Sequence, residues 1–353
     1  MFLAIKEIKR EKLRYGLIVL MIFLISYLIF ILSSLSIGLA SENTQALESW
    51  DAQAVVLNKN ANVSMNQSVL TKSDLKNATI GKNEALVGQT AVVVKNKKRP
   101  QISAQFIGLK KNQFIYHAQE IIAGRKAKTK QEVVADQTFK IKGYKLGDKL
   151  ALNGSKKKYM IVGFAKNAKI NIAPIVYGSL NSWKTLRQGM PDMQASAIIS
   201  RNSNYKYHHA DSKTYPIKTF INKLPGYTAQ NMTFELMIGF LFVISLIIIA
   251  VFMYILTMQK MHNFAVMRAQ GIPSGTLVNA TVSQAVILVV VGVVIGLAAM
   301  LLTAKALPAA VPMSFTPAIM LSGAGGMLLT GIIGSLIPIR SILKVDPAKA
   351  IGE

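Results

Sequence analysis

Four long stretches without a charged side chain constrain this sequence more than any other feature. They cover residues 15–41, 236–259, 276–304 and 306–339. A helix needs about 20 apolar residues to cross a bilayer, and inside the hydrocarbon only a helix or a closed barrel satisfies its own backbone. Each stretch is long enough. The sequence therefore predicts four transmembrane helices, one before and three after a long polar region.

The first stretch is expected to remain in the mature protein. Its apolar core runs from Leu17 to Leu35, whereas the apolar part of a cleaved signal peptide has roughly 7 to 15 residues. Residues 1–14 place apolar side chains near one helical face and basic ones around the other, which predicts an interfacial helix in the cytosolic headgroup layer. These basic residues also predict a cytosolic N-terminus.

The remaining short segments are consistent with that orientation. Basic residues flank the predicted spans at Lys260, Arg268, Arg340, Lys344 and Lys349, all on the expected cytosolic side. We predict a multi-pass cell-membrane protein with both termini in the cytosol. Its predicted parts are an interfacial helix (1–14), span one (15–41), an extracytoplasmic domain (42–235), span two (236–259), a cytosolic coupling segment (260–275), span three (276–304), an outer loop with span four (306–339) and a cytosolic tail (340–353).

The extracytoplasmic region carries most of the positive charge. The net charge is +25, and 30 of the 41 Lys and Arg residues lie within residues 42–235 against 12 acids. Such a surface outside a cell would face anionic lipid headgroups or wall polymers, and no nucleic-acid-binding motif accompanies it. A simple lysine-rich solvated surface is the alternative. Strand-like runs such as AVVL and EALVGQTAVVV, mixed with short helical segments, predict a mixed α/β domain here.

The sequence contains little that would support catalysis. There is no cysteine, which excludes disulfides, zinc–thiolate sites and thiolate nucleophiles. No phosphate-binding loop of the type G-x-x-x-x-G-K-[ST] occurs, because the closest segment, residues 143–149, has the wrong spacing. The four histidines lack metal-site spacing. We therefore expect no enzyme and no cofactor, and any ATPase must be another chain.

The segment between spans two and three points to a family. N-F-A-V-M-R-A-Q-G at residues 263–271 resembles the E-I-G-V-L-R-A-L-G segment of MacB/FtsX-type ABC permeases, with Asn263 in place of the family's acid. The tail from Asp346 resembles their D-P-x-x-A-I ending, and K-L-G-D-K-L at residues 145–150 resembles a turn of the MacB-like extracytoplasmic core domain. From the residues alone, a connector lying on the lipid surface is the alternative.

This resemblance implies partners and coupling residues. The chain would pair with a second copy of itself and with two copies of a cytosolic ABC ATPase subunit. The residues implied to couple to that ATPase are Phe264, Met267, Arg268, Gly271, Asp346 and Pro347.

Within the family, the sequence most resembles the haem-exporting permease subunit of Gram-positive bacteria. The signals are A-I-K-E-I near the start, S-E-N at residues 41–43, V-V-L-N-K at 55–59 and the V-D-P-x-x-A-I-G ending. The resemblance implies ATP-driven haem export from the membrane by mechanotransmission, for detoxification. Export of another amphipathic toxic compound or peptide, or activation of an extracellular wall hydrolase, are the alternatives.

Haem iron accepts carboxylate, Met, His or Tyr ligands, which defines the candidate haem-binding residues. Glu42 is the first candidate, since an acid at the edge of the hydrocarbon is costly without a purpose; a solvated helix-end acid is the alternative. The run Y-K-Y-H-H could bind iron or be a surface loop. The candidates are Glu42, Glu48, Met237, Tyr205, Tyr207, His208 and His209.

Overall fold

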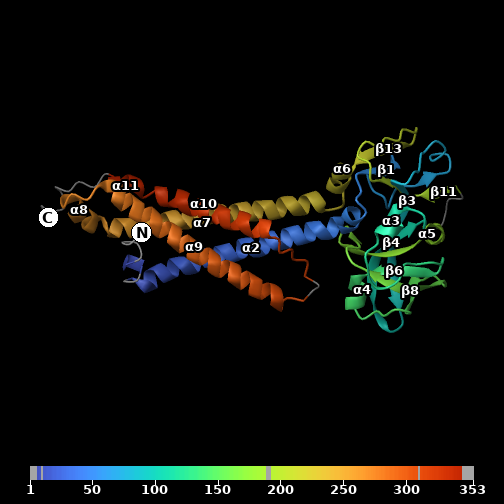
Figure 1. The fold of residues 1–353 in the computed structure, drawn as a ribbon, viewed down its shortest axis with the longest axis horizontal. Coiled ribbons are helices and arrows are strands. Elements are labelled where there is room, and N and C mark those ends of the chain that lie inside the picture. The colour runs from blue at the N-terminus through green and yellow to red at the C-terminus, as the bar shows by residue number, and fades with distance from the viewer. Residues whose placement is uncertain (1–5, 9–10, 188–191, 309–310, 344–353) are drawn as a thin grey trace. The chain divides into compact units, whose positions relative to one another are not determined.

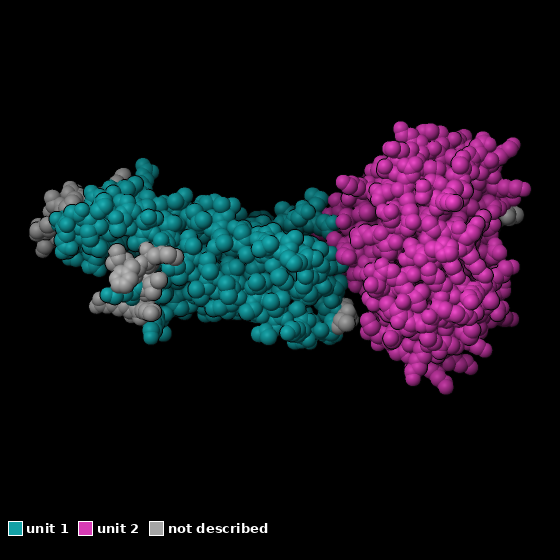
Figure 2. Space-filling view, in the orientation of Figure 1, with its two compact units in different colours: residues 1–38, 231–353 teal, residues 39–230 magenta. Residues whose placement is uncertain are grey.

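The computed structural model describes residues 6–8, 11–187, 192–308 and 311–343. The chain divides into two compact units (Figure 2), a helical unit of residues 1–38 and 231–353 and a sheet domain of residues 39–230. The four predicted spanning helices are confirmed, one before and three after the sheet domain. The sheet domain is of the mixed α/β class that the strand pattern indicated.

Long helices form the helical unit, and two short ones follow spans two and four (Figure 1). They are α2 (Lys12–Ser49, whose last turns belong to the sheet domain), α7 (Tyr227–Gln259), α8 (Met261–Ala269), α9 (Ser274–Ala306), α10 (Pro317–Leu336) and α11 (Ile339–Leu343). The charge-free stretch begins at residue 306, whereas α10 begins at Pro317. Proline has no backbone N–H, and it suits the first turn of a helix, where the N–H groups have no partner within the helix. Of the predicted interfacial helix, residues 6–8 are helical, and residues 1–5 and 9–10 lie outside the described part.

One face of α2 packs against the later helices. Tyr15, Ile18, Ile22, Ile25 and Ile29 recur at alternating spacings of three and four residues and are all buried. On the other faces apolar side chains such as Leu17 and Leu24 are exposed, as expected of helices surrounded by lipid.

Glycines let α9 approach α2 closely. A Cβ atom at Gly296 would lie 2.3 Å from the Ser26 hydroxyl oxygen, and one at Gly292 would lie 2.6 Å from an Ile22 methyl carbon. The Ser26 hydroxyl also lies 3.3 Å from the Gly292 carbonyl oxygen, to which it donates. The small-xxx-small pair in span three is therefore a packing surface for α2.

The sheet domain is built on one large mixed sheet. Its strand order is β13-β1-β12-β3-β4-β10-β6-β8-β5, with β7 and β9 pairing off this path, and β11 and β2 form a separate ribbon. The strands are β1 (Ala54–Asn58), β2 (Leu70–Thr71), β3 (Glu84–Asn96), β4 (Arg99–Leu109), β5 (Ile121–Gly124), β6 (Glu132–Asp136), β7 (Lys149–Leu152), β8 (Lys158–Ala165), β9 (Lys169–Ile170), β10 (Ala173–Ser179), β11 (Met193–Ala195), β12 (Ala197–Ser200) and β13 (Ser212–Pro216). The helices are α3 (Phe114–Ala118), α4 (Gln137–Ile141), α5 (Leu180–Arg187) and α6 (Ile217–Asn222).

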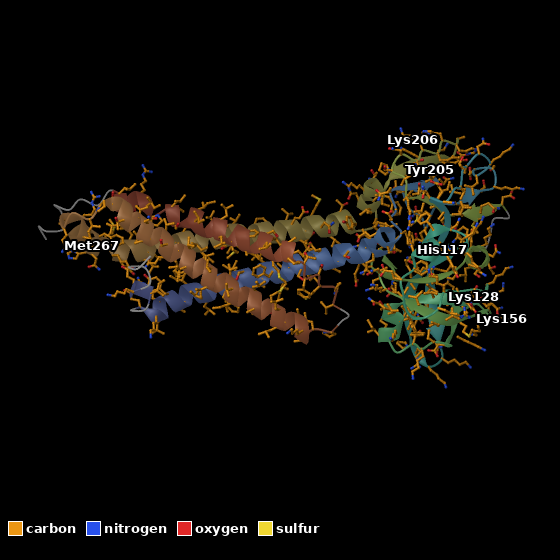
Figure 3. All side chains as sticks on the ribbon, in the orientation of Figure 1. His117, Lys128, Lys156, Tyr205, Lys206 and Met267 are labelled. Carbon is orange, nitrogen blue, oxygen red and sulfur yellow. The ribbon has the colours of Figure 1, made fainter. Side chains whose placement is uncertain are left out.

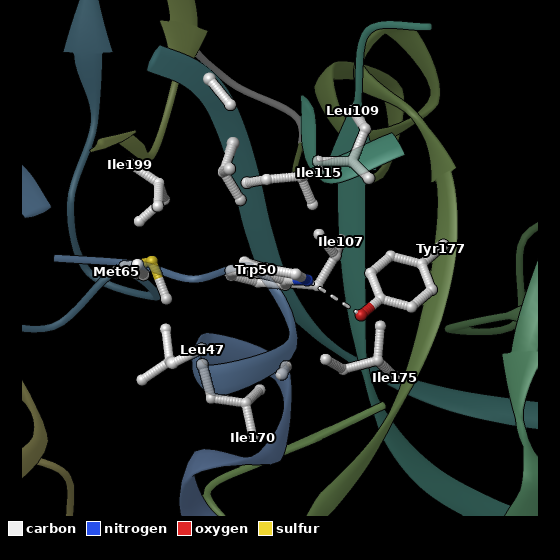
Figure 4. Close-up of a cluster of buried hydrophobic side chains, with 14 of the residues drawn as sticks. Leu47, Trp50, Met65, Ile107, Leu109, Ile115, Ile170, Ile175, Tyr177 and Ile199 are labelled. Atoms are coloured by element: carbon white, nitrogen blue, oxygen red, sulfur yellow. Dashed lines mark hydrogen bonds between the residues drawn. The ribbon is translucent and has the colours of Figure 1, made fainter. Parts of the chain in front are cut away.

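The end of α2 fixes one core of the sheet domain. Leu47 and Trp50 are almost fully buried among strand residues such as Ile107 and Ile199 (Figure 4). The Trp50 indole N–H donates a hydrogen bond of 3.2 Å to the Tyr177 hydroxyl, which satisfies a buried donor far from its sequence neighbours. The span-one helix thus ends as part of the folded sheet domain.

A second core covers the other side of the strands. Trp183 of α5 is fully buried and lies over glycines in two adjacent strands. A side chain at either glycine would collide with it. A Cβ atom added at Gly88 would lie 2.2 Å from the Trp183 ring, and one added at Gly108 would lie 2.6 Å from the Trp183 Cβ atom. The paired strands place these two glycines opposite each other. The register of β3 and β4 therefore creates the space that α5 occupies.

Candidate functional site

Glu42 lies in the last turns of α2 and is paired with a lysine from β9. Its carboxylate contacts the Lys169 ammonium, and the two side chains are only 14% and 16% exposed. The N–H groups of Asn171 and Ile172 donate to the carbonyl oxygens of Asn43 and Glu42, at 3.1 and 3.3 Å. An iron ion bound here would compete with Lys169 for the carboxylate. The role of Glu42 as a haem ligand stays a prediction.

Glu48 and Met237 are exposed candidates. The Glu48 carboxylate accepts a hydrogen bond from the Thr44 hydroxyl one turn earlier on α2. Met237 lies on α7 in the helical unit and is 43% exposed. The described part of the chain contains no group of three or more His, Cys, Asp or Glu placed to hold a metal ion.

The Y-K-Y-H-H run lies between β12 and β13, and the structure separates its members. Tyr207 is buried, and its hydroxyl donates to the Asp74 carbonyl oxygen. Its ring stacks on that of His209 with centroids 6.4 Å apart, and the His209 Nδ1 atom lies 3.4 Å from an Asp74 carboxylate oxygen. Tyr207 and His209 thus face the β2–β3 connection.

Tyr205 and His208 instead line a separate small cavity of about 230 Å³. The Tyr205 hydroxyl donates to the Thr79 carbonyl oxygen at 3.2 Å. Burial, and then the nearby charge of Glu84, raises the pKa of Tyr205 to about 12. The run does not form one iron-binding cluster, although each member remains an untested candidate.

The predicted coupling segment contains helix α8 followed by a tight turn. Phe264 is buried against Leu277 of α9 and Ile342 of α11, and Met267 (Figure 3) packs at the edge of the same cluster. Arg268 is half-buried. Phe264 therefore anchors α8, whereas Val266, which is 38% exposed, belongs to the surface open to a partner.

Gly271 ends α8 in a conformation that suits glycine. Its φ angle is +89°, and its N–H donates to the Arg268 carbonyl oxygen at 3.0 Å. The N–H of the next residue, Ile272, donates to the Met267 carbonyl oxygen at 3.1 Å. The turn thus directs the chain into α9 after Pro273. Asp346 and Pro347, the other two coupling candidates, lie outside the described residues.

A buried polar network beside α8 was not predicted from the sequence. Lys260 is 9% exposed, and its ammonium donates to the Tyr15 hydroxyl at 2.7 Å and to the Glu7 carboxylate. Gln284 of α9 donates to the same two groups. The available signal was Gln284, an amide inside a charge-free stretch. This network ties α2, the end of α7 and α9 together next to α8.

Three comparisons place the chain among known proteins. Residues 235–347 match the family described as FtsX-like permease C-terminal. The chain is 25% identical over 355 residues to the hemin transport system permease protein HrtB of Staphylococcus haemolyticus, covering 100% of this chain and 99% of that protein. It is 23% identical over 235 residues to an ABC transporter permease of Mycobacterium tuberculosis, covering 65% of this chain and 64% of that protein.

Among solved structures, the periplasmic region of MacB from Actinobacillus actinomycetemcomitans is similar with a TM-score of 0.36 and 11% identity. The match covers 48% of this chain and 90% of that one. The matched domain, the permease relatives and the four helices long and apolar enough to span a membrane together indicate a multi-pass membrane protein that carries an FtsX-like permease C-terminal domain.

Proposed function

We propose that this chain is the permease subunit of an ATP-driven exporter that removes haem from the membrane. Two copies of the chain would work with two copies of a separate ATPase subunit. The observation that carries the proposal is the similarity to a hemin transport permease over the full length, sheet domain included, where exporters of unlike substrates would be free to differ.

The packing of α8 supports transmission of force from the ATPase. Phe264 joins α8 to α9 and α11, and the Lys260 network joins the adjoining turn to α2 and α9. A displacement of α8 would therefore be shared by several spanning helices, because close-packed cores move as units rather than deforming. In this proposal Val266 and Arg268 contact the ATPase, and Asn263 offers an amide in place of an acid.

The proposal requires α8 in the cytosol and the sheet domain outside the cell. Because the sequence has no cysteine, single cysteines report orientation without background. In intact cells, a membrane-impermeant maleimide should label the exposed position Lys156→Cys and should label His262→Cys only after permeabilisation. The reverse pattern would contradict the orientation and, with it, the coupling scheme.

Export is tested in a strain that lacks the gene. The strain should grow poorly in haem, and the wild-type chain should restore growth, whereas Val266→Glu should not, because it places a charge on the surface assigned to the ATPase. Unchanged growth in haem combined with sensitivity to other amphipathic compounds would favour another substrate, and a cell-chaining defect would favour activation of a wall hydrolase.

The predicted iron ligand can be tested separately through its partner. If Glu42 binds iron, Lys169→Met should strengthen haem binding, because the ammonium no longer competes for the carboxylate, and Glu42→Gln should weaken it. The Soret band of haem on the purified chain measures both changes. A result in which the two variants leave the spectrum unchanged would remove Glu42 from the proposal.

A further inference from the structure

A cavity of about 580 Å³ opens in the sheet domain beside the start of α5. Its walls come from the β4–α3 connection, the segment before β6 and the end of β10. Sixteen residues between Leu109 and Gln194 line it. All of them belong to one unit and none is among the predicted haem ligands.

The lining of this cavity is strongly basic. It contains five lysines, Lys110, Lys111, Lys128, Lys130 and Lys184, and no acid. Among the described residues none of these five has its ammonium nitrogen within 4 Å of a carboxylate oxygen, although the ammonium groups of Lys59, Lys166 and Lys169 elsewhere in the domain do. A concave surface of one charge sign raises the local concentration of the opposite ion. The charge pattern favours an anionic ligand.

Lys184 shows that these charges act on one another. Burial, and then the charge of Lys110, lowers the pKa of Lys184 from its ordinary value. Its ammonium donates to the Gln194 side-chain oxygen at 2.9 Å, which satisfies it without neutralising it. A bound acidic group would relieve this repulsion and replace lost hydration.

The oxygen of a buried amide in the cavity wall lacks a hydrogen-bond donor. Gln119 is only 8% exposed, and its Oε1 atom has no hydrogen bond in the structure. Buried polar side chains in folded proteins are nearly always hydrogen-bonded, so this amide oxygen, which can only accept, marks a position in the cavity wall where a hydrogen-bond donor of a ligand can supply the partner. This observation is independent of the lysines.

Apolar surface lies between these polar groups. Leu109, Ala127 and Leu180 line the cavity together with the Tyr116 ring, which is fixed because its hydroxyl donates to the Ala127 carbonyl oxygen at 3.1 Å. The Ser179 hydroxyl accepts the Ser182 N–H at 3.0 Å and so caps α5, whose positive N-terminal end faces the same space. The volume suits one small organic molecule.

We propose that this cavity is a binding site for an amphipathic organic anion with two or more acidic groups, held by the five lysines. Under the proposed function, on which this identification rests, the ligand is the transported porphyrin and its two carboxylates contact the lysines. The site would then hold the porphyrin by its acidic edge, without any bond to iron.

Metal-free protoporphyrin IX is the probe, because iron ligands such as Glu42 cannot contribute to its binding. Its dimethyl ester is the matched compound, with the same ring and no negative charge. Both tryptophans of the chain lie in the sheet domain, and Trp183 belongs to the helix that borders the cavity, so quenching of tryptophan fluorescence reports binding to the purified full-length chain.

The wild-type chain should bind the dicarboxylate about tenfold or more tightly than the diester, since the lysine ammonium groups make charge-assisted hydrogen bonds to carboxylates and not to esters. Replacing Lys128 and Lys184 together by Gln should raise Kd for the dicarboxylate by about tenfold or more. Lys156→Gln, which removes an exposed charge that does not line the cavity, should change Kd less than about twofold.

Equal affinity for acid and ester, or no binding of the acid, would overturn the site, and neither result depends on how a variant folds. A loss of affinity with Lys156→Gln equal to that of the double variant would also overturn it, by showing only diffuse attraction. If the site is confirmed and the deletion strain is nevertheless insensitive to haem, the binding site stands and the export function fails.

Discussion

Glu132 should stabilise the sheet domain in a way that disappears in acid. Its carboxylate accepts two hydrogen bonds from the Arg125 guanidinium, at 2.7 and 2.8 Å, and further ones from the N–H groups of Lys128 and Thr129, at 2.7 and 3.3 Å. The hydrogen bonds from Arg125 lower the pKa of Glu132 to about 2. Glu132→Gln removes the charge but keeps the shape.

The magnitude follows from linkage between protonation and folding. A glutamate that titrates near 4.3 when unfolded and near 2 when folded contributes about 3 kcal/mol at neutral pH. Arg125 is 46% exposed, so screening by solvent reduces the expected loss to about 2 kcal/mol. Because the folded-state pKa is the lower one, this contribution is complete above about pH 5 and is lost as the pH falls toward 2.

Urea unfolding of the full-length chain in detergent measures this effect. Trp50 and Trp183 are the chain's two tryptophans and both lie in the sheet domain, so their fluorescence reports the unfolding of that domain. Glu120→Gln is the matched control, since its pair with Lys166 is exposed on both sides and should be worth less than about 0.5 kcal/mol. The reasoning is refuted if the wild-type chain and Glu132→Gln have the same free energy of unfolding at pH 7, or if the difference between them is as large at pH 2.5 as at pH 7.

Three further changes probe the helical unit. Gly296→Leu should destabilise the helical unit by about 3 kcal/mol or more, because the new side chain overlaps α2. Gly325→Leu is the control, since Gly325 has open space beside it. Thermal aggregation in detergent compares the two variants, and equal midpoints would contradict the packing of α9 on α2. Phe264→Ala should cost about 3 kcal/mol and loosen α8, seen as faster hydrogen exchange in residues 261–269; unchanged exchange would show that α8 is held by other contacts. Gly271→Ala should cost about 1 kcal/mol at its positive φ, measured as a lower aggregation temperature, and an unchanged value would contradict the strain.

The sequence alone determined the division of the chain into spanning helices and a sheet domain. A run of charge-free residues long enough for a bilayer has few other structures open to it, because backbone groups in hydrocarbon must pair within the helix. The spacing of Gly292 and Gly296 in span three can likewise be read from the sequence and is typical of close helix packing, because a residue without a side chain permits such an approach. These inferences depend on local composition and spacing.

Tertiary structure decided which side chains meet. Glu42 pairs with Lys169, and the Lys260 ammonium hydrogen-bonds the Tyr15 hydroxyl near the N-terminus. No local sequence pattern encodes these contacts, because they depend on strand order and helix packing. The lysines of the cavity likewise come from separate segments of the sequence and meet only in the folded chain. The burial of Phe264 against α9 and α11 also follows from helix packing, whereas the motif alone implied coupling to a partner. Residues far apart in sequence meet only through the topology, so their chemistry becomes visible only in the folded chain.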